Sequence, residues 1–257
     1  MDLKKIAQDL YEAEKGCYQI TMPSATYPEM TVEDAYAIQL ENIKRKVAEG
    51  EKVIGMKVGL TSKAMQTLLK VNEPDYGHLT DKMLLLEGQV CPMDQLIQPK
   101  GEGEMAFCLK ETLRGPGGTI ADVYNATDWV IPAIEIVDSR VKDWKITLAD
   151  TIADNGSSAR FVIGGRMSPI GKVDMRLTGM TLEKNGELVN SGTCAEVWGS
   201  PAAAVAWLAN KLSEFNIELK AGSIVLAGAV TAAIPAEKGD SFTVSFHGMG
   251  SLTVKFK

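Results

Sequence analysis

Two glutamates stand two residues apart at the start of an apolar segment. Glu102 and Glu104 lie in the glycine-rich stretch KGEGEMAF, residues 100–107. In an extended strand, residues i and i+2 point to the same face, so both carboxylates would lie on one side of the strand. Met105 and Phe107 would then pack into the core. Two carboxylates arranged in this way can act together on a cation.

A third glutamate, Glu135, interrupts the apolar segment Trp129–Val137. An acid inside an apolar strand is costly unless it is paired or bound to a metal. Three converging carboxylates would suit a hard divalent cation such as Mg²⁺, with open positions for water or substrate. The alternative is that the first two glutamates form a solvated strand end and that Glu135 pairs with Arg140 or Lys57. The apolar surroundings of Glu135 favour the metal site.

Lys57 and Asp75 are candidate groups for proton transfer. Lys57 lies between Met56 and Val58 on a short predicted strand, where a partly buried ammonium could move a proton. Its spacing alone favours a surface lysine whose ammonium reaches solvent. Asp75 lies in the segment 73–77, EPDYG, a constrained loop that could present a catalytic carboxylate. On local grounds a turn-forming aspartate is the more common outcome.

A polar segment, DNGSSAR at residues 154–160, leads into an apolar strand. The hydroxyls of Ser157 and Ser158, nearby backbone N–H groups and the Arg160 guanidinium could together bind a carboxylate. A capped turn with an exposed arginine explains the same pattern.

The elements that must position these residues fall into two parts. Periodicity and caps predict helices over residues 3–15, 31–49 and 62–69, a strand over 52–59 and a loop over 72–77. Strand patterns dominate from residue 83, with helices near 120–127 and 200–215 and a hairpin turn at Asn185-Gly186. We therefore expect an α+β chain, with an α-rich N-terminal region over 1–72 and a β-rich catalytic domain over 73–257.

Composition excludes several other classes of protein. The chain has 257 residues, 33 acidic against 27 basic, and a net charge of -6, which argues against a nucleic-acid binder. It contains no apolar run of about 18 residues and no secretory signal, so we expect a cytoplasmic protein. Four separated cysteines are expected to be reduced thiols, and two histidines without cysteine neighbours make a zinc site unlikely.

The motifs taken together resemble the fumarylacetoacetate hydrolase superfamily. The resemblance spans nearly the whole chain. It rests on the segments KVGLTSK at 57–63, PDYG at 74–77, EGE at 102–104, IPAIEIVDSR at 131–140 and IADN at 152–155. More closely, they resemble its branch of hydratases and decarboxylases from aromatic meta-cleavage pathways.

This resemblance implies a mixed, barrel-like β-fold with a smaller helical N-terminal part. It implies Mg²⁺ or Mn²⁺ held by Glu102, Glu104 and Glu135. Lys57 and Asp75 match positions linked to proton transfer. By the same resemblance, Ser157 and Ser158 match substrate-contacting positions, and Arg160 would suit a second carboxylate on the substrate.

The implied reaction is hydration of 2-hydroxypenta-2,4-dienoate, which the segment PDYG favours because decarboxylases tend to have an apolar residue in place of Asp75. The segments SARF at 158–161 and GRM at 165–167 instead favour decarboxylation of 2-oxo-3-hexenedioate. Hydration of 2-oxohept-4-ene-1,7-dioate is a third candidate. A homo-oligomer, with association to the partner enzyme of the pathway, is expected. The alternative to an enzyme is a non-catalytic partner protein. The presence of Lys57, Asp75 and all three glutamates disfavours that alternative.

Overall fold

Two β-sheets and seven α-helices make up the chain in the computed structural model, which describes residues 1–257 and all their side chains except those of Leu68 and Leu69. The helices are α1 (Leu3–Gly16), α2 (Pro23–Thr26), α3 (Val32–Ala48), α4 (Lys63–Leu69), α5 (Ile120–Ala126), α6 (Leu148–Ala153) and α7 (Pro201–Ser213). The predicted α+β class with a barrel-like sheet is confirmed.

The larger sheet has the strand order β2-β1-β11-β5-β6-β7-β3, with β12 added to β5 and β8 added to β6. Its strands are β1 (Val53–Gly59), β2 (Asp75–Thr80), β3 (Leu84–Leu86), β5 (Lys100–Leu109), β6 (Thr127–Val137), β7 (Ser158–Ile163), β8 (Ser168–Pro169), β11 (Ile224–Ala229) and β12 (Ile234–Pro235). The smaller sheet has the order β10-β9-β13-β14-β4. Its strands are β4 (Val90–Cys91), β9 (Gly179–Lys184), β10 (Glu187–Thr193), β13 (Ser241–Phe246) and β14 (Gly250–Phe256).

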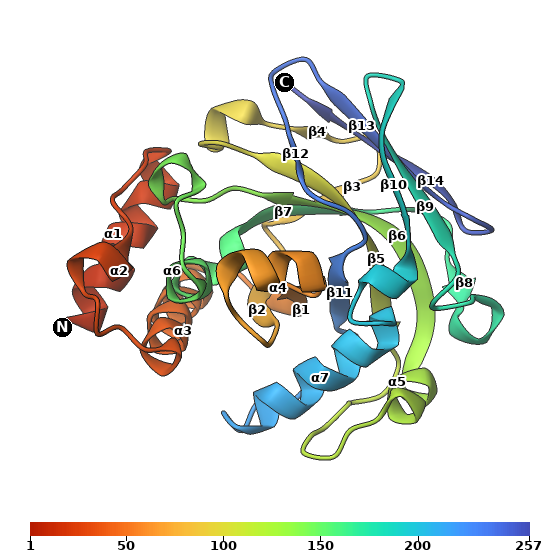
Figure 1. Cartoon of the computed structure of the whole chain (residues 1–257), viewed down its shortest axis with the longest axis horizontal. Coiled ribbons are helices and arrows are strands. Elements are labelled where there is room, and N and C mark those ends of the chain that lie inside the picture. Colours follow the sequence, from red (N-terminus) through yellow and green to blue (C-terminus); the bar gives the residue numbers. More distant parts are fainter.

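The larger sheet is strongly curled (Figure 1). Strands β1 and β6 are separated by β11 and β5, which would place them about 14 Å apart in a flat sheet. Nevertheless, Lys57 Nζ on β1 lies 3.9 Å from Glu135 Oε1 on β6. The sheet therefore folds over its concave face, and side chains from strands that are not neighbours meet there.

The smaller sheet packs on the convex side of β5. An added Cβ at Gly101 would lie 2.3 Å from the Phe242 ring, and one at Gly103 would lie 2.7 Å from Val244. The two glycines thus allow the sheets to approach closely. The glutamates that alternate with them point to the opposite, concave face.

Helices cover the remaining sides of the larger sheet. Helices α1, α2, α3 and α6 form one group, and α5 lies beside α7 elsewhere on the sheet (Figure 1). The N-terminus of α3 has the predicted cap: Thr31 Oγ1 accepts from the N–H of Asp34 (3.1 Å), and Asp34 Oδ2 accepts from the N–H of Thr31 (3.0 Å). The hairpin turn at Asn185-Gly186 also joins β9 and β10 as predicted.

The structure corrects the loop predicted over residues 72–77. Asp75 begins strand β2, which pairs with β1 in antiparallel register. Pro74 and Gly77 are typical of a turn, but pairing with a strand formed elsewhere in the chain overrides that local preference. Strands β1 and β2 lie on either side of residue 72, the predicted boundary between the two regions, and both belong to the larger sheet. Short helix α6, which no pattern predicted, lies just before the polar segment 154–160.

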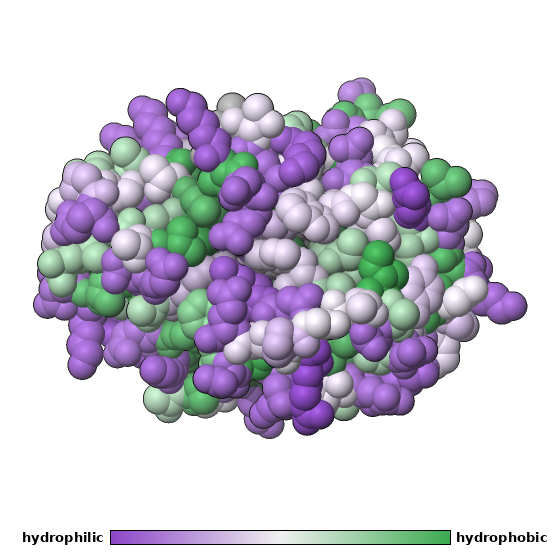
Figure 2. Space-filling view, turned by 60° about the horizontal axis from the view of Figure 1, so that its bottom comes forward, coloured by the Kyte–Doolittle hydropathy of each residue, from purple (hydrophilic) through white to green (hydrophobic). Residues whose placement is uncertain are grey.

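The surface in Figure 2 is mixed, with hydrophilic residues interspersed among small hydrophobic groups. Among the described residues, no helix is both long enough and apolar enough to cross a membrane.

Candidate active site

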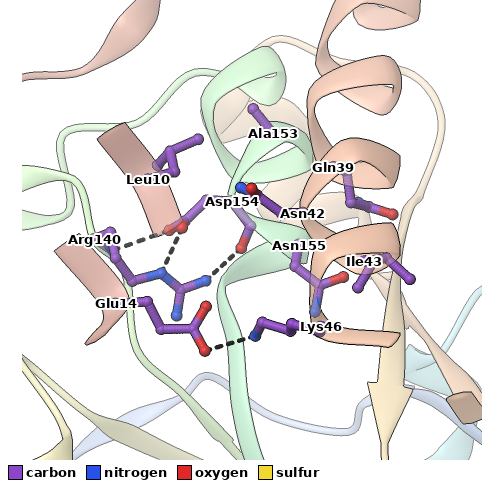
Figure 3. A pocket seen from close by; sticks show the side chains of 10 residues that line it. All are labelled: Leu10, Glu14, Gln39, Asn42, Ile43, Lys46, Arg140, Ala153, Asp154 and Asn155. Carbon is purple, nitrogen blue, oxygen red and sulfur yellow. Dashed lines mark hydrogen bonds and ion pairs between the residues drawn. The ribbon is translucent and has the colours of Figure 1, made fainter. Parts of the chain in front are cut away.

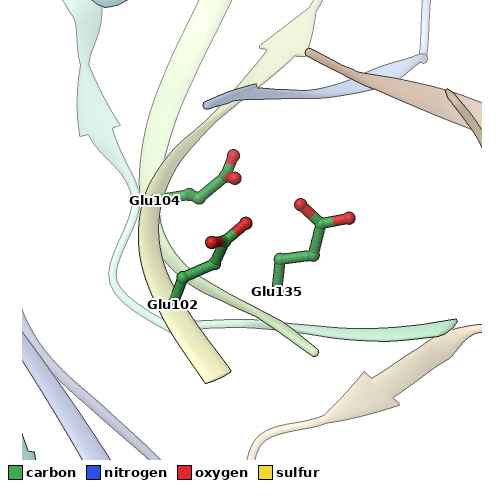
Figure 4. A group of neighbouring side chains, drawn as sticks. All are labelled: Glu102, Glu104 and Glu135. Carbon is green, nitrogen blue, oxygen red and sulfur yellow. The ribbon is translucent and has the colours of Figure 1, made fainter. Parts of the chain in front are cut away.

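Three glutamates converge on the concave face of the larger sheet (Figure 4). Glu102 on β5 lies directly opposite Glu135 on β6, and Glu104 lies two residues further along β5. One carboxylate oxygen from each residue can be chosen so that all three lie within 4.8 Å of one another. The structure therefore brings together the three acids singled out by their spacing and surroundings.

The protein offers few hydrogen-bond donors and little positive charge to these buried carboxylates. Burial, and then the nearby charge of Glu135, raises the pKa of Glu102 to about 8 and raises that of Glu104 well above its usual range. Glu104 Oε2 accepts from the N–H of Gly228 (2.8 Å), whereas its Oε1 and both carboxylate oxygens of Glu135 have no hydrogen-bond partner among the described residues. Buried oxygens without donors are costly. A bound divalent cation would satisfy them.

Lys57 is buried, with only 4% of its surface exposed, and thus is not a surface lysine. Its ammonium lies 3.9 Å from Glu135 Oε1. Burial lowers the pKa of Lys57, but Glu135 and then Asp75 outweigh that effect, so its pKa is raised overall. Lys57 is therefore a fixed positive charge beside the glutamates.

Asp75 lies on the same face as Lys57. In the β1–β2 register Gly59 is opposite Asp75 and Gly77 is opposite Lys57, so the two charged side chains alternate with glycines on one side of the strand pair. Asp75 is 1% exposed, and its Oδ1 has no hydrogen-bond partner among the described residues. Burial raises its pKa, although Lys57 opposes the shift. Burial thus favours the protonated form of this carboxyl, whereas the neighbouring Lys57 ammonium favours the charged form.

Apolar side chains line the interior of the curled sheet next to this polar cluster. Leu79 follows Asp75 and Gly77 on β2, and Ala106 follows the two glutamates on β5. They pack with Phe161 and Leu226 in one buried cluster. The charged groups therefore border a layer of apolar side chains, which excludes water from that side and strengthens electrostatic interactions between them.

Within the segment 154–160, the turn that carries the serines approaches Lys57, whereas Arg160 points away from the glutamates. Ser157 and Ser158 are buried; Ser157 Oγ lies 3.3 Å from Thr151 Oγ1, and Ser158 Oγ has no partner among the described residues. Arg160 pairs in register with Ile136, one residue beyond Glu135, so its side chain leaves the opposite face of the sheet.

The Arg160 guanidinium donates to the Ala159 carbonyl (2.8 Å) and to Gln95 Oε1 (2.9 Å). The structure does not bring it to the three glutamates. A contact between this arginine and a substrate stays a prediction.

Sequence reasoning did not single out three buried polar residues that join the elements of the site. Gln39 Nε2 donates to the carbonyls of Tyr76 (3.0 Å) and Ile152 (2.8 Å), and its Oε1 lies 2.9 Å from His78 Nδ1. Asn155 bonds to the backbone of His78. Burial lowers the pKa of His78 to about 4, so the ring is neutral. One feature of the sequence could have indicated this network: Gln39 lies on the apolar face of the helix predicted over 31–49.

A charged cluster lies behind the segment 154–160, around a cavity of about 10 Å³ (Figure 3). The Arg140 side chain donates to both the carboxylate and the carbonyl of Asp154, and Lys46 Nζ donates to Glu14 Oε1 (2.6 Å). Arg140 thus binds Asp154, not Glu135 as one of the alternatives above supposed. This ion pair anchors the start of the segment that carries the two serines.

Comparison with known proteins places this geometry in a family. A family model described as "Fumarylacetoacetate (FAA) hydrolase C-terminal" matches residues 52–257. The chain is 46% identical to a 2-hydroxyhexa-2,4-dienoate hydratase of Comamonas testosteroni, over 97% of this chain and 95% of the relative. It is 45% identical to a 2-oxo-hept-4-ene-1,7-dioate hydratase of Escherichia coli, over 98% of this chain and 96% of the relative.

One solved structure has the same fold over nearly all of its length. It is that of a 4-oxalocrotonate decarboxylase from Pseudomonas putida G7, complexed with magnesium and adipate. The TM-score is 0.97 at 41% sequence identity, covering 99% of this chain and 97% of that one.

Proposed function

The chain belongs to the fumarylacetoacetate hydrolase family, and we propose that it is a metal-dependent lyase that hydrates 2-hydroxypenta-2,4-dienoate to 4-hydroxy-2-oxopentanoate in aromatic meta-cleavage catabolism. The observation that carries the proposal is the meeting of buried Lys57 and Asp75 with three convergent glutamates on one face of the sheet. The relatives named as hydratases of 2-hydroxy- and 2-oxo-alkenoates support the same reaction class.

Glu102, Glu104 and Glu135 would hold Mg²⁺ or Mn²⁺. Carboxylate oxygens are the ligands that these cations prefer, and three of the buried oxygens here lack donors. Magnesium in the similar decarboxylase structure supports this choice. A cation bound there would stabilise negative charge that develops on the 2-oxygen of the substrate.

The chain's own residues would move the protons. The dienol loses its O–H proton and gains a proton at C5, which leaves an enone. The hydroxyl of a water then adds at C4, the water gives up its other proton, and one proton adds at C3. Asp75, whose pKa is raised by burial, would hold the proton that is exchanged with the substrate carbons. Lys57 would keep its positive charge near the 2-oxygen, which favours charge development there.

Ser157 and Ser158 would contact the substrate. The support is that both serines are buried, that Gly156 beside them approaches Lys57, and that Ser158 Oγ has no partner among the described residues. A carboxylate of the substrate would accept a hydrogen bond from a hydroxyl left free in this way.

Decarboxylation of 2-oxo-3-hexenedioate is the alternative, supported by likeness to the decarboxylase structure. Hydration of 2-oxohept-4-ene-1,7-dioate is a further alternative, supported by likeness to the Escherichia coli hydratase. Asp75 favours hydration, because water addition needs a group that moves protons to and from carbon.

The test offers purified Mg²⁺-loaded protein each of the three substrates and follows loss of their ultraviolet absorbance, with CO₂ release measured in parallel. We expect turnover of the five-carbon dienoate without CO₂, loss of that turnover with EDTA and its return with Mg²⁺. Turnover of the six-carbon diacid alone, with CO₂ released, would overturn the hydratase assignment. Activity unaffected by EDTA would overturn the metal site.

We further propose a cytoplasmic homo-oligomer that associates with the partner enzyme of the pathway. The support is the resemblance alone. Sedimentation of the pure protein, and of its mixture with a pathway decarboxylase, measures both associations. A monomer that sediments independently of the decarboxylase would contradict them.

A further inference from the structure

The turn at residues 155–157 has an unusual backbone conformation. Asn155, Gly156 and Ser157 have φ values of 58°, 61° and 55°, all in the left-handed region. This region is unfavourable for residues with side chains, although asparagine tolerates it better than most. Such strain persists only where surrounding contacts hold the backbone in place, and it is concentrated at functional sites.

The side chain of Asn155 supplies the main contact. Its Oδ1 accepts from the N–H of His78 (2.7 Å), and its Nδ2 donates to the carbonyl of His78 (2.9 Å). Strand β2 is at the edge of the sheet and pairs with β1 on its other side. The amide of Asn155 therefore satisfies backbone groups that a neighbouring strand would otherwise pair, in a buried position where leaving them unpaired is costly.

This docking brings the turn against Lys57. An added Cβ at Gly77 would lie 2.4 Å from the Asn155 carbonyl oxygen, which shows how closely the turn approaches β2. An added Cβ at Gly156 would lie 2.5 Å from Lys57 Cε and 3.0 Å from its Nζ. On β1, a Cβ at Gly59 would also lie 3.0 Å from Nζ. The ammonium is thus confined between the turn and its own strand.

We propose that Asn155 is a positioning residue for the reaction. Its amide holds the turn 155–157 against β2, and the turn in turn holds the Lys57 ammonium beside Glu135. The inference rests on the proposed function to the extent that Lys57 acts in catalysis. Asn155 itself contacts neither Lys57 nor the glutamates through its side-chain hydrogen bonds, so its effect is indirect.

Two variants test the proposal. Asn155→Gly keeps the left-handed backbone accessible and removes both hydrogen bonds, whereas Asn155→Asp keeps the acceptor and loses the donor. We expect Asn155→Gly to lower kcat for hydration at least about tenfold, with KM and the Kd for Mg²⁺ changed by less than about twofold. Asn155→Asp should lie between it and the unmodified protein.

Asn185→Gly is a matched control. Asn185 also has a left-handed backbone (φ 56°), donates from Nδ2 to Asp240 Oδ1 (2.8 Å) and accepts from the N–H of Ser241 (2.8 Å), but it lies in the β9–β10 hairpin. Its loss should lower the stability of the protein while kcat stays within about twofold. Circular dichroism and urea unfolding establish the folded fraction of every variant.

A partial reaction separates this inference from the proposed function. Exchange of the C3 protons of 2-oxopentanoate for deuterium in D₂O can be monitored by proton NMR. This exchange reports proton transfer without water addition. If the unmodified protein exchanges these protons but does not hydrate the dienoate, the hydratase proposal fails and the exchange rates of the variants still decide the role of Asn155.

Equal exchange and hydration rates in Asn155→Gly and the unmodified protein would overturn the inference. So would losses that follow only the folded fraction or the Mg²⁺ affinity, or an unmodified protein with neither activity.

Discussion

Replacing Gly59 with alanine is the most direct test of how Lys57 and Asp75 share one face. The added Cβ would lie 2.1 Å from Asp75 Oδ1 and 3.0 Å from Lys57 Nζ, whereas an ordinary contact begins at 3.4 Å. Asp75 must move by more than about 1 Å, yet it is buried on a paired strand. Overpacking of this kind costs about 1–3 kcal/mol of stability. Displacement of a catalytic group by about 1 Å costs about 100-fold in rate, so with Asp75 in its proposed role we expect kcat to fall by that order.

A double-mutant cycle with Asp75→Ala isolates the contact. In the Asp75→Ala background the two carboxyl atoms are gone, and of the three nearest atoms only Lys57 Nζ, at 3.0 Å, remains. A shift of about 0.4 Å at the end of that side chain relieves the contact even in its confined position. Gly59→Ala should then cost less than about 0.5 kcal/mol in urea unfolding, giving a coupling of about 1–2 kcal/mol. Gly171→Ala is the control, since a Cβ there meets nothing within 4 Å and its φ is not left-handed.

Additive stability changes in the cycle would refute the argument. So would a Gly59→Ala variant whose kcat stays within about twofold of the unmodified protein, since the geometry then tolerates the displacement.

Two further perturbations have expected outcomes. Glu135→Gln removes the negative charge of a proposed cation ligand, whose carboxylate lies 3.9 Å from Lys57 Nζ. At an effective dielectric of 20 the interaction of these two charges is about 4 kcal/mol. Calorimetry should show Mg²⁺ binding at least about tenfold weaker, and Glu183→Gln on β9 is the control that should leave it unchanged. His78 has a folded pKa of about 4 against 6.5, so below pH 6.5 the unfolded chain binds the proton first and stability falls as pH falls towards 4. Urea unfolding should show about 2 kcal/mol less stability at pH 5 than at pH 7.5 from this group. A His78→Gln variant should lose that part of the pH dependence, and an identical pH profile in the variant would contradict the assignment.

Local patterns were enough to predict the position of most elements. The capping box at Thr31, the hairpin at Asn185 and the alternation of β5 are all set by residues near in sequence. The alternation also predicted that Glu102 and Glu104 share a face, because side-chain direction in a strand depends only on position along it.

Local patterns failed where distant segments decide the outcome. Asp75 was expected in a loop and lies on a strand, because β1 supplies its hydrogen-bonding partners. The spacing around Lys57 favoured a surface lysine over a buried proton-transfer group, but the curl of the sheet and the turn at Gly156 bury it. Arg160 was considered for a substrate carboxylate, and register with β6 directs its side chain to the other face.

The sequence by itself thus determined which chemistry is available: three acidic oxygen donors, one lysine and one aspartate in segments whose spacing limits where they can point. Only the tertiary structure decided that these groups meet. Convergence of β1, β2, β5 and β6 depends on the curl of one sheet and on the glycines that let the smaller sheet and the turn at 155–157 approach it. Those contacts join residues far apart in the chain, and their geometry depends on packing that no local pattern encodes.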